Sequence, residues 1–158
     1  MHIPHVVIIG GGPAGSTLGA ILAKEGLEVT ILEKARFPRH HIGEALQPAA
    51  FELLNFHLQL GPKMAEQGFA KKFGALYYWG ETRNRWSVLF DDRLEADLDT
   101  LDRDSIHEGA YDFSWQVDRG KFDQILLEEA EERGAKVFQE TEVVRPLLDG
   151  QKVVGVVA

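Results

Sequence analysis

The sequence predicts an α/β fold in which helices cover a parallel sheet, and three observations support this. An apolar run rich in β-branched residues, from His5 to Ile9, leads directly into a glycine-rich turn over residues 10–16. A helical pattern follows that turn. A second apolar run, Val29 to Leu32, comes after the helix. A strand, a helix and a strand in this order form a unit whose two strands lie parallel in one sheet.

The glycine-rich turn has the spacing G-x-G-x-x-G, formed by Gly10, Gly12 and Gly15, and Glu33 follows the second strand. Gly10 permits the tight turn, Gly12 lets the backbone approach a pyrophosphate, and Gly15 lets the helix pack closely on the strand. The helix N-terminus offers N–H groups to the phosphates, and the acid accepts from ribose hydroxyls. The unit therefore predicts a dinucleotide site, the alternative being a glycine turn of purely structural use. The expected contacts in this part of the chain are Gly10, Gly12, Pro13, Ala14, Gly15, Ser16, Glu33 and Lys34.

The first helix is expected to begin at Pro13, where the missing N–H costs nothing, and to end before Gly26. A loop follows the second strand, because Pro38 and Gly43 interrupt regular structure, and a further helix starts near Gln47. The positive charges of this loop come from Arg36, Arg39, His40 and His41. They predict a loop that wraps an anionic cofactor, although a solvated basic loop would carry the same charges.

The later elements carry clear boundary signals. Asp118 is a good N-cap for a helix over Arg119–Arg133, and Gly134 is a good stop. A short strand over Ala135–Gln139 follows. A hairpin is then predicted around Asp149-Gly150, between apolar runs over residues 143–148 and 153–157. Its valine-rich second strand would leave an apolar edge, so we expect the chain to be a piece of a longer protein.

Composition excludes several classes of function. The chain has 158 residues, 44% of them hydrophobic, and a net charge of −8, which disfavours nucleic acid as a partner. It has no cysteine, which excludes a disulfide framework and a thiolate metal site, and its six histidines lack metal-ligand spacing. No apolar run approaches the ~20 residues that span a bilayer. We expect a soluble cytoplasmic protein with no membrane partner and no metal.

Together, the glycine turn, Glu33-Lys34, Phe37-Pro38-Arg39 and His41-Ile42-Gly43-Glu44 resemble the N-terminal part of flavin-dependent halogenases. These enzymes share the fold of FAD-dependent aromatic hydroxylases. The resemblance extends over nearly the whole chain, because Trp115 to Leu126 is similar to the family's helix beside the cofactor. It implies FAD as the cofactor. The contacts that it implies beyond the glycine turn are Arg39, Ile42, Gly43, Glu44, Ala45, Arg119 and Val143.

One of these implied contacts departs from the family pattern, and two have other interpretations. Ala45 stands where the family often has serine, which alters a polar contact near the flavin. Arg119 would otherwise be an exposed residue of a first helical turn, and Val143 would otherwise be a core side chain.

Residues 68–75, followed by Trp79-Gly80, resemble the segment around the family's catalytic lysine. The pattern Lys-x-Gly-Ala places that lysine at Lys72 rather than Lys71. In the family, halide attacks a flavin hydroperoxide to give hypohalous acid, which the lysine receives as a haloamine or through a hydrogen bond. The alternative is a surface lysine ahead of an aromatic strand over Ala75–Trp79.

The resemblance implies a domain organisation and a reaction. Residues 1–158 form a partial FAD-binding domain with a parallel sheet and a β-meander hairpin, and residues 68–115 form a β-rich insertion on the substrate side. The expected reaction is halogenation of a phenolic, pyrrole or carrier-bound aromatic substrate, rather than of tryptophan. Because only one dinucleotide fingerprint is present, a separate flavin reductase is expected to supply reduced flavin.

Three other functions remain open from the sequence. One is an aromatic hydroxylase or another FAD oxidoreductase of the same fold. Another is a nicotinamide-dependent dehydrogenase, which the Phe37-Pro38-Arg39 block disfavours. The last is a nucleotide-binding fragment without catalytic activity.

Overall fold

The computed structural model describes residues 5–81, 84–90 and 113–158. The chain forms two compact units, one built from Met1–Ile42 and Asp118–Ala158, the other from Gly43–Val117. The predicted site residues are divided between them. The first unit contains the glycine turn, the basic loop, Arg119 and Val143, and the second contains Gly43, Glu44, Ala45 and Lys72.

The first unit is built on a three-stranded parallel sheet with the order β1-β2-β7. Its strands are β1 (His5–Ile9), β2 (Glu28–Leu32) and β7 (Lys136–Phe138). The register places Ile31 in the middle strand opposite Ile8 on one side and Val137 on the other. Ile8 and Ile31 are both buried, so the apolar runs of the sequence form the centre of the sheet. The predicted α/β fold with a parallel sheet is confirmed.

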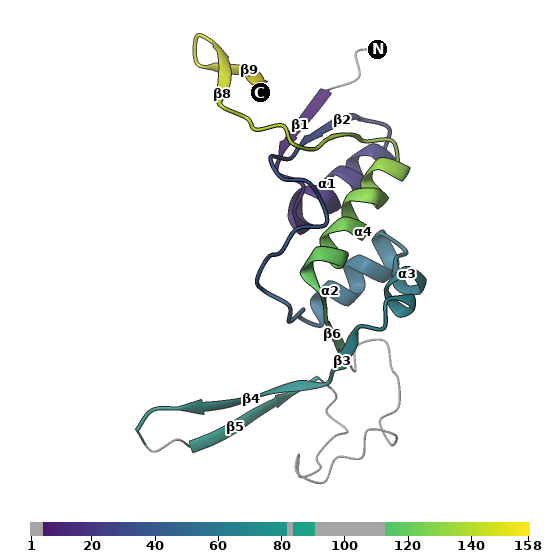
Figure 1. Ribbon diagram of the computed structural model, residues 1–158, viewed down its shortest axis with the longest axis vertical. Coiled ribbons are helices and arrows are strands. Elements are labelled where there is room, and N and C mark those ends of the chain that lie inside the picture. The colour runs from purple at the N-terminus through teal and green to yellow at the C-terminus, as the bar shows by residue number, and fades with distance from the viewer. Residues whose placement is uncertain (1–4, 82–83, 91–112) are drawn as a thin grey trace. The chain divides into compact units, whose positions relative to one another are not determined.

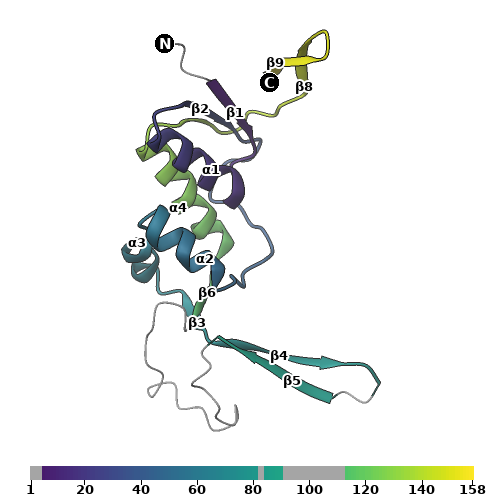
Figure 2. The ribbon, with the colours of Figure 1, turned by 180° about the vertical axis from the view of Figure 1, so that it is seen from behind.

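Two helices, α1 (Pro13–Lys24) and α4 (Arg119–Glu132), lie side by side in this unit (Figure 1, Figure 2). Small residues let α1 approach the sheet closely. A Cβ at Gly19 would lie 2.6 Å from Cδ1 of the buried Ile31, so a larger residue there would force either that side chain or the helix to shift. Ala20 on α1 and Leu126 on α4 are almost completely buried. This packing fixes the start of α1 beside the carboxyl end of β1.

The ends of both helices follow their predicted caps. α1 is followed by Gly26 at a φ of +85° and α4 by Gly134 at a φ of +103°, a region that favours glycine. The carboxylate of Asp118 accepts a hydrogen bond from the backbone N–H of Lys121 at 3.2 Å. Asp118 is therefore the N-cap of α4, as the sequence predicts.

We expect Asp118→Ala to lower the free energy of unfolding by about 1 kcal/mol, because it removes the side-chain acceptor at the start of α4. Asp118→Ser keeps an acceptor and should retain most of the stability. Urea denaturation of the three proteins measures the difference. Equal stability of the alanine variant and the parent would contradict a capping role.

The first unit ends in an antiparallel hairpin of β8 (Arg145–Asp149) and β9 (Lys152–Val157). Asp149 pairs with Lys152, so the turn lies at Gly150 and Gln151, and Gly150 has a φ of +60°. The predicted hairpin is therefore present, although its first strand begins at Arg145 rather than Val143 and its turn lies one residue later than predicted.

The second unit combines short helices with two strand pairs. Its core is formed by Leu54, Leu58, Leu60 and Met64, each almost fully buried. Its helical elements are α2 (Ala49–Glu52), the π-helical turn η1 (Leu53–His57) and α3 (Gly61–Glu66). Strand β3 (Ala70–Lys72) pairs with β6 (Ser114–Gln116), and β4 (Gly74–Trp79) pairs with β5 (Asn84–Leu89), both antiparallel. The expected insertion over residues 68–115 falls in this unit, and its residues 82–83 and 91–112 lie outside the described residues.

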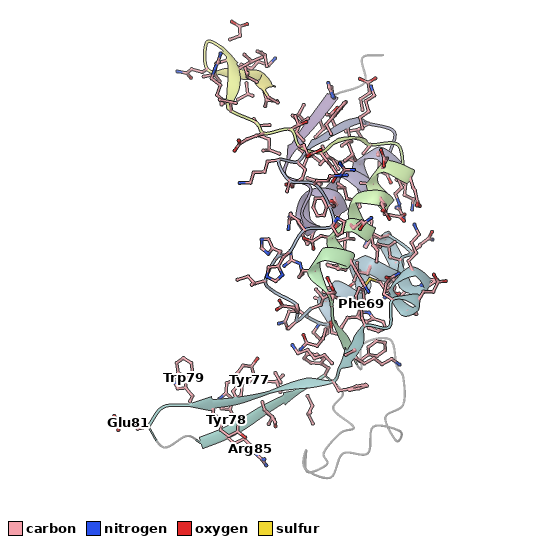
Figure 3. The ribbon with its side chains drawn as sticks, viewed as in Figure 1. Phe69, Tyr77, Tyr78, Trp79, Glu81 and Arg85 are labelled. Atoms are coloured by element: carbon pink, nitrogen blue, oxygen red, sulfur yellow. The ribbon has the colours of Figure 1, made fainter. Side chains whose placement is uncertain are left out.

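The hairpin of β4 and β5 presents aromatic side chains on both faces. Figure 3 shows Tyr77 and Trp79 on one face, and Tyr78 with Arg85 on the other. Tyr77 stacks on Trp86 with ring centroids 4.2 Å apart, while Trp79 is 80% exposed. The aromatic strand predicted over Ala75–Trp79 is thus present within β4.

Across the described part of the chain, no helix combines the length and the apolar character that crossing a membrane requires.

Candidate functional site

The glycine-rich turn connects the end of β1 to the start of α1, and the three glycines of its G-x-G-x-x-G pattern differ in what they do. Gly10 has a φ of +101° and donates to the carbonyl of Leu32 at 2.8 Å, so the turn itself requires glycine there. A Cβ at Gly15 would overlap the carbonyl oxygen of Gly10. Gly12 has an ordinary φ of −70°, and a Cβ there would meet only the guanidinium of Arg39, at 3.4 Å. The fold therefore requires Gly10 and Gly15, but gives no reason for glycine at position 12.

The start of α1 is suited to an anion. Gly12 is the N-cap and supplies no side-chain hydrogen bond, and the first turn, which begins with Pro13, contains no acidic residue. The Ser16 side chain is fully buried and donates to the carbonyl of Gly11 at 2.7 Å. Ser16 therefore supports the turn through its hydroxyl. The partial positive charge of the helix end stays available to a phosphate group.

Glu33 ties the glycine turn to the end of β2. Its side chain is 5% exposed, and its carboxylate accepts from the backbone N–H of Gly11 at 2.7 Å and of Ala35 at 2.8 Å. Each carboxylate oxygen has more than one lone pair, so these bonds leave capacity to accept from a ribose hydroxyl. The ribose contact of Glu33 stays a prediction.

A cavity of about 280 Å³ opens beside Glu33, at the carboxyl ends of β1 and β2. Open α/β sheets bind ligands at this end of their strands. The cavity brings four predicted residues together, Gly10, Glu33, Lys34 and Val143, although they come from distant parts of the sequence. Its complete lining is Ile9, Gly10, Leu32, Glu33, Lys34, Thr141, Glu142 and Val143.

A larger cleft, of about 900 Å³, lies between β1 and the β8–β9 hairpin. Valines form most of its lining, so it offers few groups that could hold phosphates or ribose. The smaller cavity is the better candidate for a dinucleotide site, because that is where the glycine turn and Glu33 meet.

Arg39 brings a cation to the glycine turn. Its Nη1 lies 3.2 Å from a carboxylate oxygen of Asp123, and its guanidinium carbon lies 4.6 Å from the ring centroid of Phe37. The backbone N–H of Phe37 donates to Oε1 of Gln139 at 2.6 Å, which fastens the loop to the segment after β7. Arg39 thus lies in a supported position beside Gly12.

The other positive charges of the predicted basic loop lie at its surface. Arg36 is 78% exposed at its side chain and its Nη1 is 3.8 Å from the exposed Glu140, while His40 and His41 are exposed. Among the four basic residues of the loop, Arg39 is the one beside the glycine turn.

Arg119 holds the same loop in place through hydrogen bonds of its side chain. Its Nε and Nη2 donate to the two carboxylate oxygens of Asp123 at 2.8 and 3.0 Å, and its Nη1 donates to the carbonyl of Ile42 at 2.5 Å. The Arg119 side chain is 11% exposed, which corrects the alternative of an exposed first-turn residue. Ile42 takes part through its carbonyl, since its side chain is 74% exposed. The FAD contacts expected of both residues remain a proposal.

In the second unit, Gly43 precedes a short segment, Glu44 to Leu46, that pairs with β6 and Val117. The carbonyl of Glu44 accepts from the N–H of Val117 at 2.9 Å, and Ala45 forms an antiparallel bridge with Gln116. Gly43 has a φ of +101°, so glycine is required there for the backbone. The structure explains the Gly-Glu pair as the start of this strand-like segment.

Lys72 and Lys71 are neighbours on β3 and contact different aromatic rings. The Lys72 Nζ lies 5.2 Å from the ring centroid of Phe90, and the Lys71 Nζ lies 4.8 Å from that of Phe113. Lys72 pairs with the buried Ser114 across the ladder. Successive side chains of a strand point to opposite faces, so the two amines cannot replace each other.

The structure adds three residues to the candidate site for which the sequence indicates no role. They are Asp123, Gln139 and Thr141. Asp123 binds both arginines, Gln139 holds Phe37, and Thr141 lines the cavity. The spacing of Arg119 and Asp123, one helical turn apart, is the sequence signal that could have indicated their ion pair. Gln139 offers no comparable local signal.

Comparison with known proteins identifies relatives of the whole chain. A family model described as "FAD binding domain" matches residues 4–158. The tryptophan 2-halogenase of Chondromyces crocatus is 39% identical over 159 residues, which cover 98% of this chain and 26% of that protein. The 1H-pyrrole-2-carbonyl-[peptidyl-carrier protein] chlorinase of Pseudomonas fluorescens is 43% identical over 147 residues, which cover 90% and 32%. These two identities do not separate a tryptophan halogenase branch from a pyrrole branch.

Among solved structures, the myxobacterial chondrochloren halogenase CndH is 35% identical and superposes with a TM-score of 0.82. The match covers 99% of this chain and 33% of CndH, which is described as a new variant of FAD-dependent halogenases. The chain thus spans about a quarter to a third of the length of the relatives it matches.

Proposed function

This chain belongs to the FAD-binding domain family, and we propose that it is the FAD-binding portion of a flavin-dependent halogenase that acts on an aromatic substrate. The observation that carries the proposal is the identity to named halogenases, 39% over 98% of the chain in one case. This likeness covers the glycine turn and also the Lys72 segment, so it is not confined to the cofactor fingerprint.

The residues of the first unit fit FAD. The pyrophosphate would lie at the start of α1, where Gly12 leaves space and Arg39 supplies a cation. A ribose would lie in the cavity beside Glu33, with the adenine near Glu142 and Val143. When bound, the flavin supplies the oxygen activation that oxidises halide to hypohalous acid.

Lys72 would direct the halogen. Its amine would hold hypohalous acid by a hydrogen bond, or would form an N–halogen bond with release of water. The halogen then passes to the aromatic ring, the ring loses a proton, and the amine is restored. An amine suits both roles, because it is a nucleophile when neutral and a hydrogen-bond donor in either state. The contact with the Phe90 ring, at 5.2 Å from its centroid, would favour one orientation of the side chain.

The partners of the complete protein follow from this reaction. It would need chloride or bromide, a separate flavin reductase and an aromatic substrate. One relative is named as a chlorinase of a pyrrole held on a peptidyl carrier protein, which makes a carrier-bound substrate a specific candidate. The second candidate function is a FAD-dependent aromatic hydroxylase of the same fold, which would need no halide.

The test uses the complete protein with a supplied flavin reductase, NADH and oxygen. FAD binding is measured first, by titration followed with flavin fluorescence. Product is then identified by mass spectrometry with bromide or chloride, using phenol, pyrrole and indole compounds, free and carrier-bound. We expect halogenated product that depends on halide. Hydroxylated product that is indifferent to halide would establish the second candidate, and absence of FAD binding would overturn both.

A further inference from the structure

Asp123 is a buried carboxylate at the centre of an ion-pair network in the first unit. Its side chain is 0% exposed, and it accepts hydrogen bonds from Arg119 at 2.8 and 3.0 Å and from Arg39 at 3.2 Å. A carboxylate in such a position persists because its charge is paired and its lone pairs are used. Two arginines around one carboxylate give this three-residue cluster a net charge of +1.

The guanidinium of Arg39 has one side bound to a carboxylate and another that faces the glycine turn. Its Nη1 is bound by Asp123, and its Nη2 is the atom that a Cβ on Gly12 would meet at 3.4 Å. The nitrogen bound by the carboxylate and the nitrogen facing the glycine turn belong to one rigid, planar group. Fixing one nitrogen therefore fixes the direction of the other.

Asp123 also holds the backbone of the loop that carries Arg39. Through Arg119 it is linked to the carbonyl of Ile42, which accepts from Arg119 Nη1 at 2.5 Å. The loop is thus anchored on both sides of residues 40–41, by the Arg39 side chain and by the Ile42 carbonyl. One carboxylate serves both anchors.

We propose that Asp123 is the positioning residue that aims Arg39 at the FAD pyrophosphate, an inference that rests on the proposed FAD site at Gly12. An arginine side chain loses considerable rotamer freedom when it binds a ligand, and a partner that holds it beforehand removes part of that cost. Asp123 touches no cofactor atom in this proposal. It acts on affinity through the orientation of Arg39.

The other buried carboxylate of the same helix provides the control. Glu129 is 8% exposed and accepts from the Nε of Arg133, four residues later, at 2.6 Å. It resembles Asp123 in burial and in pairing with an arginine at this spacing, but Arg133 is not a residue of the glycine turn or its loop. Glu129→Gln therefore reports what the loss of a buried ion pair on α4 does to stability alone.

The experiment is a double-mutant cycle on FAD affinity, with Asp123→Asn, Arg39→Met and the double variant. Arg39→Met keeps an unbranched side chain at this position and removes the cation. We expect Asp123→Asn to weaken FAD binding about tenfold, the loss of roughly one well-placed charged contact. In the Arg39→Met background the same change should have little further effect, because most of its effect passes through Arg39 and only the loop anchor through Arg119 remains. Glu129→Gln should lower the melting temperature and keep the FAD dissociation constant within about twofold of the parent's.

Two results would overturn the proposal: an Asp123→Asn variant with the parent's FAD affinity, or additive losses in the double variant. If Asp123→Asn does not fold, Asp123→Glu replaces it, since that variant keeps the charge and moves the carboxylate by one methylene group. Parent-like FAD affinity of a folded Asp123→Glu variant would then count against positioning. A parent protein that binds no FAD would instead refute the proposed function, so the two failures are distinguishable.

Discussion

Replacing Gly12 with valine is expected to abolish FAD binding and leave the fold intact. The backbone at Gly12 has a φ of −70°, which any residue adopts, and an added Cβ would meet only the flexible end of Arg39 at 3.4 Å. The folded chain therefore tolerates a side chain at this position. The branched side chain of valine would instead fill the space at the start of α1 where the pyrophosphate is proposed to lie. We expect a loss in FAD affinity on the order of a hundredfold or more, equivalent to about 3 kcal/mol.

Neighbouring glycines serve as controls for this substitution. Gly12→Ala is expected to give an intermediate loss of FAD affinity with an unchanged melting temperature. Gly15→Val should lower the melting temperature as well as FAD binding, because even its Cβ would overlap the Gly10 carbonyl oxygen. Flavin absorbance after purification and a thermal melt separate the two cases. A Gly12→Val protein that holds FAD with the affinity of the parent would show that the phosphates lie elsewhere.

The sequence was sufficient to predict the elements whose signals are local. The β1–α1–β2 unit was predicted because the periodicity changes at a glycine turn, and α4 because Asp118 and Gly134 mark its ends. Local signals did not indicate the burial of Asp123 and Glu129. A helix with many acidic residues is typical of an exposed helix, and the sequence does not show which arginines pair with those acids. The boundary of the second unit at Gly43 also depends on contacts between residues far apart in the chain.

For the candidate site, residue types were easier to predict than the contacts that hold them. Positive charge in the loop was visible in the sequence, but it did not distinguish Arg39 from Arg36. That distinction comes from long-range contacts, including the bond of Phe37 to Gln139, 102 residues away, and the ion pair of Arg39 with Asp123. Glu33 was expected to face a ribose, and the structure adds that it also holds the glycine turn through Gly11.

The second large effect is expected at Lys72. Lys72→Ala in the complete protein should lower the rate of halogenation on the order of a hundredfold to a thousandfold, the range for loss of a positioned hydrogen-bond donor at the reacting centre. FAD affinity and oxygen consumption should stay close to those of the parent, because none of the groups proposed to hold FAD is changed. Mass spectrometry of the product with bromide or chloride, together with an oxygen electrode, measures both rates.

Lys71→Ala is the matched control, because it removes the same functional group from the adjacent position of β3. Lys71 contacts the ring of Phe113, whereas Lys72 contacts that of Phe90, so each substitution removes one cation from one aromatic ring. A general effect of losing a lysine on this strand would therefore appear in both variants. A specific role requires that Lys71→Ala keep most of the halogenation rate, since alternation along the strand separates the two amines. If Lys72→Ala halogenates at the rate of the parent, or if the two variants lose activity equally, the lysine does not direct the halogen.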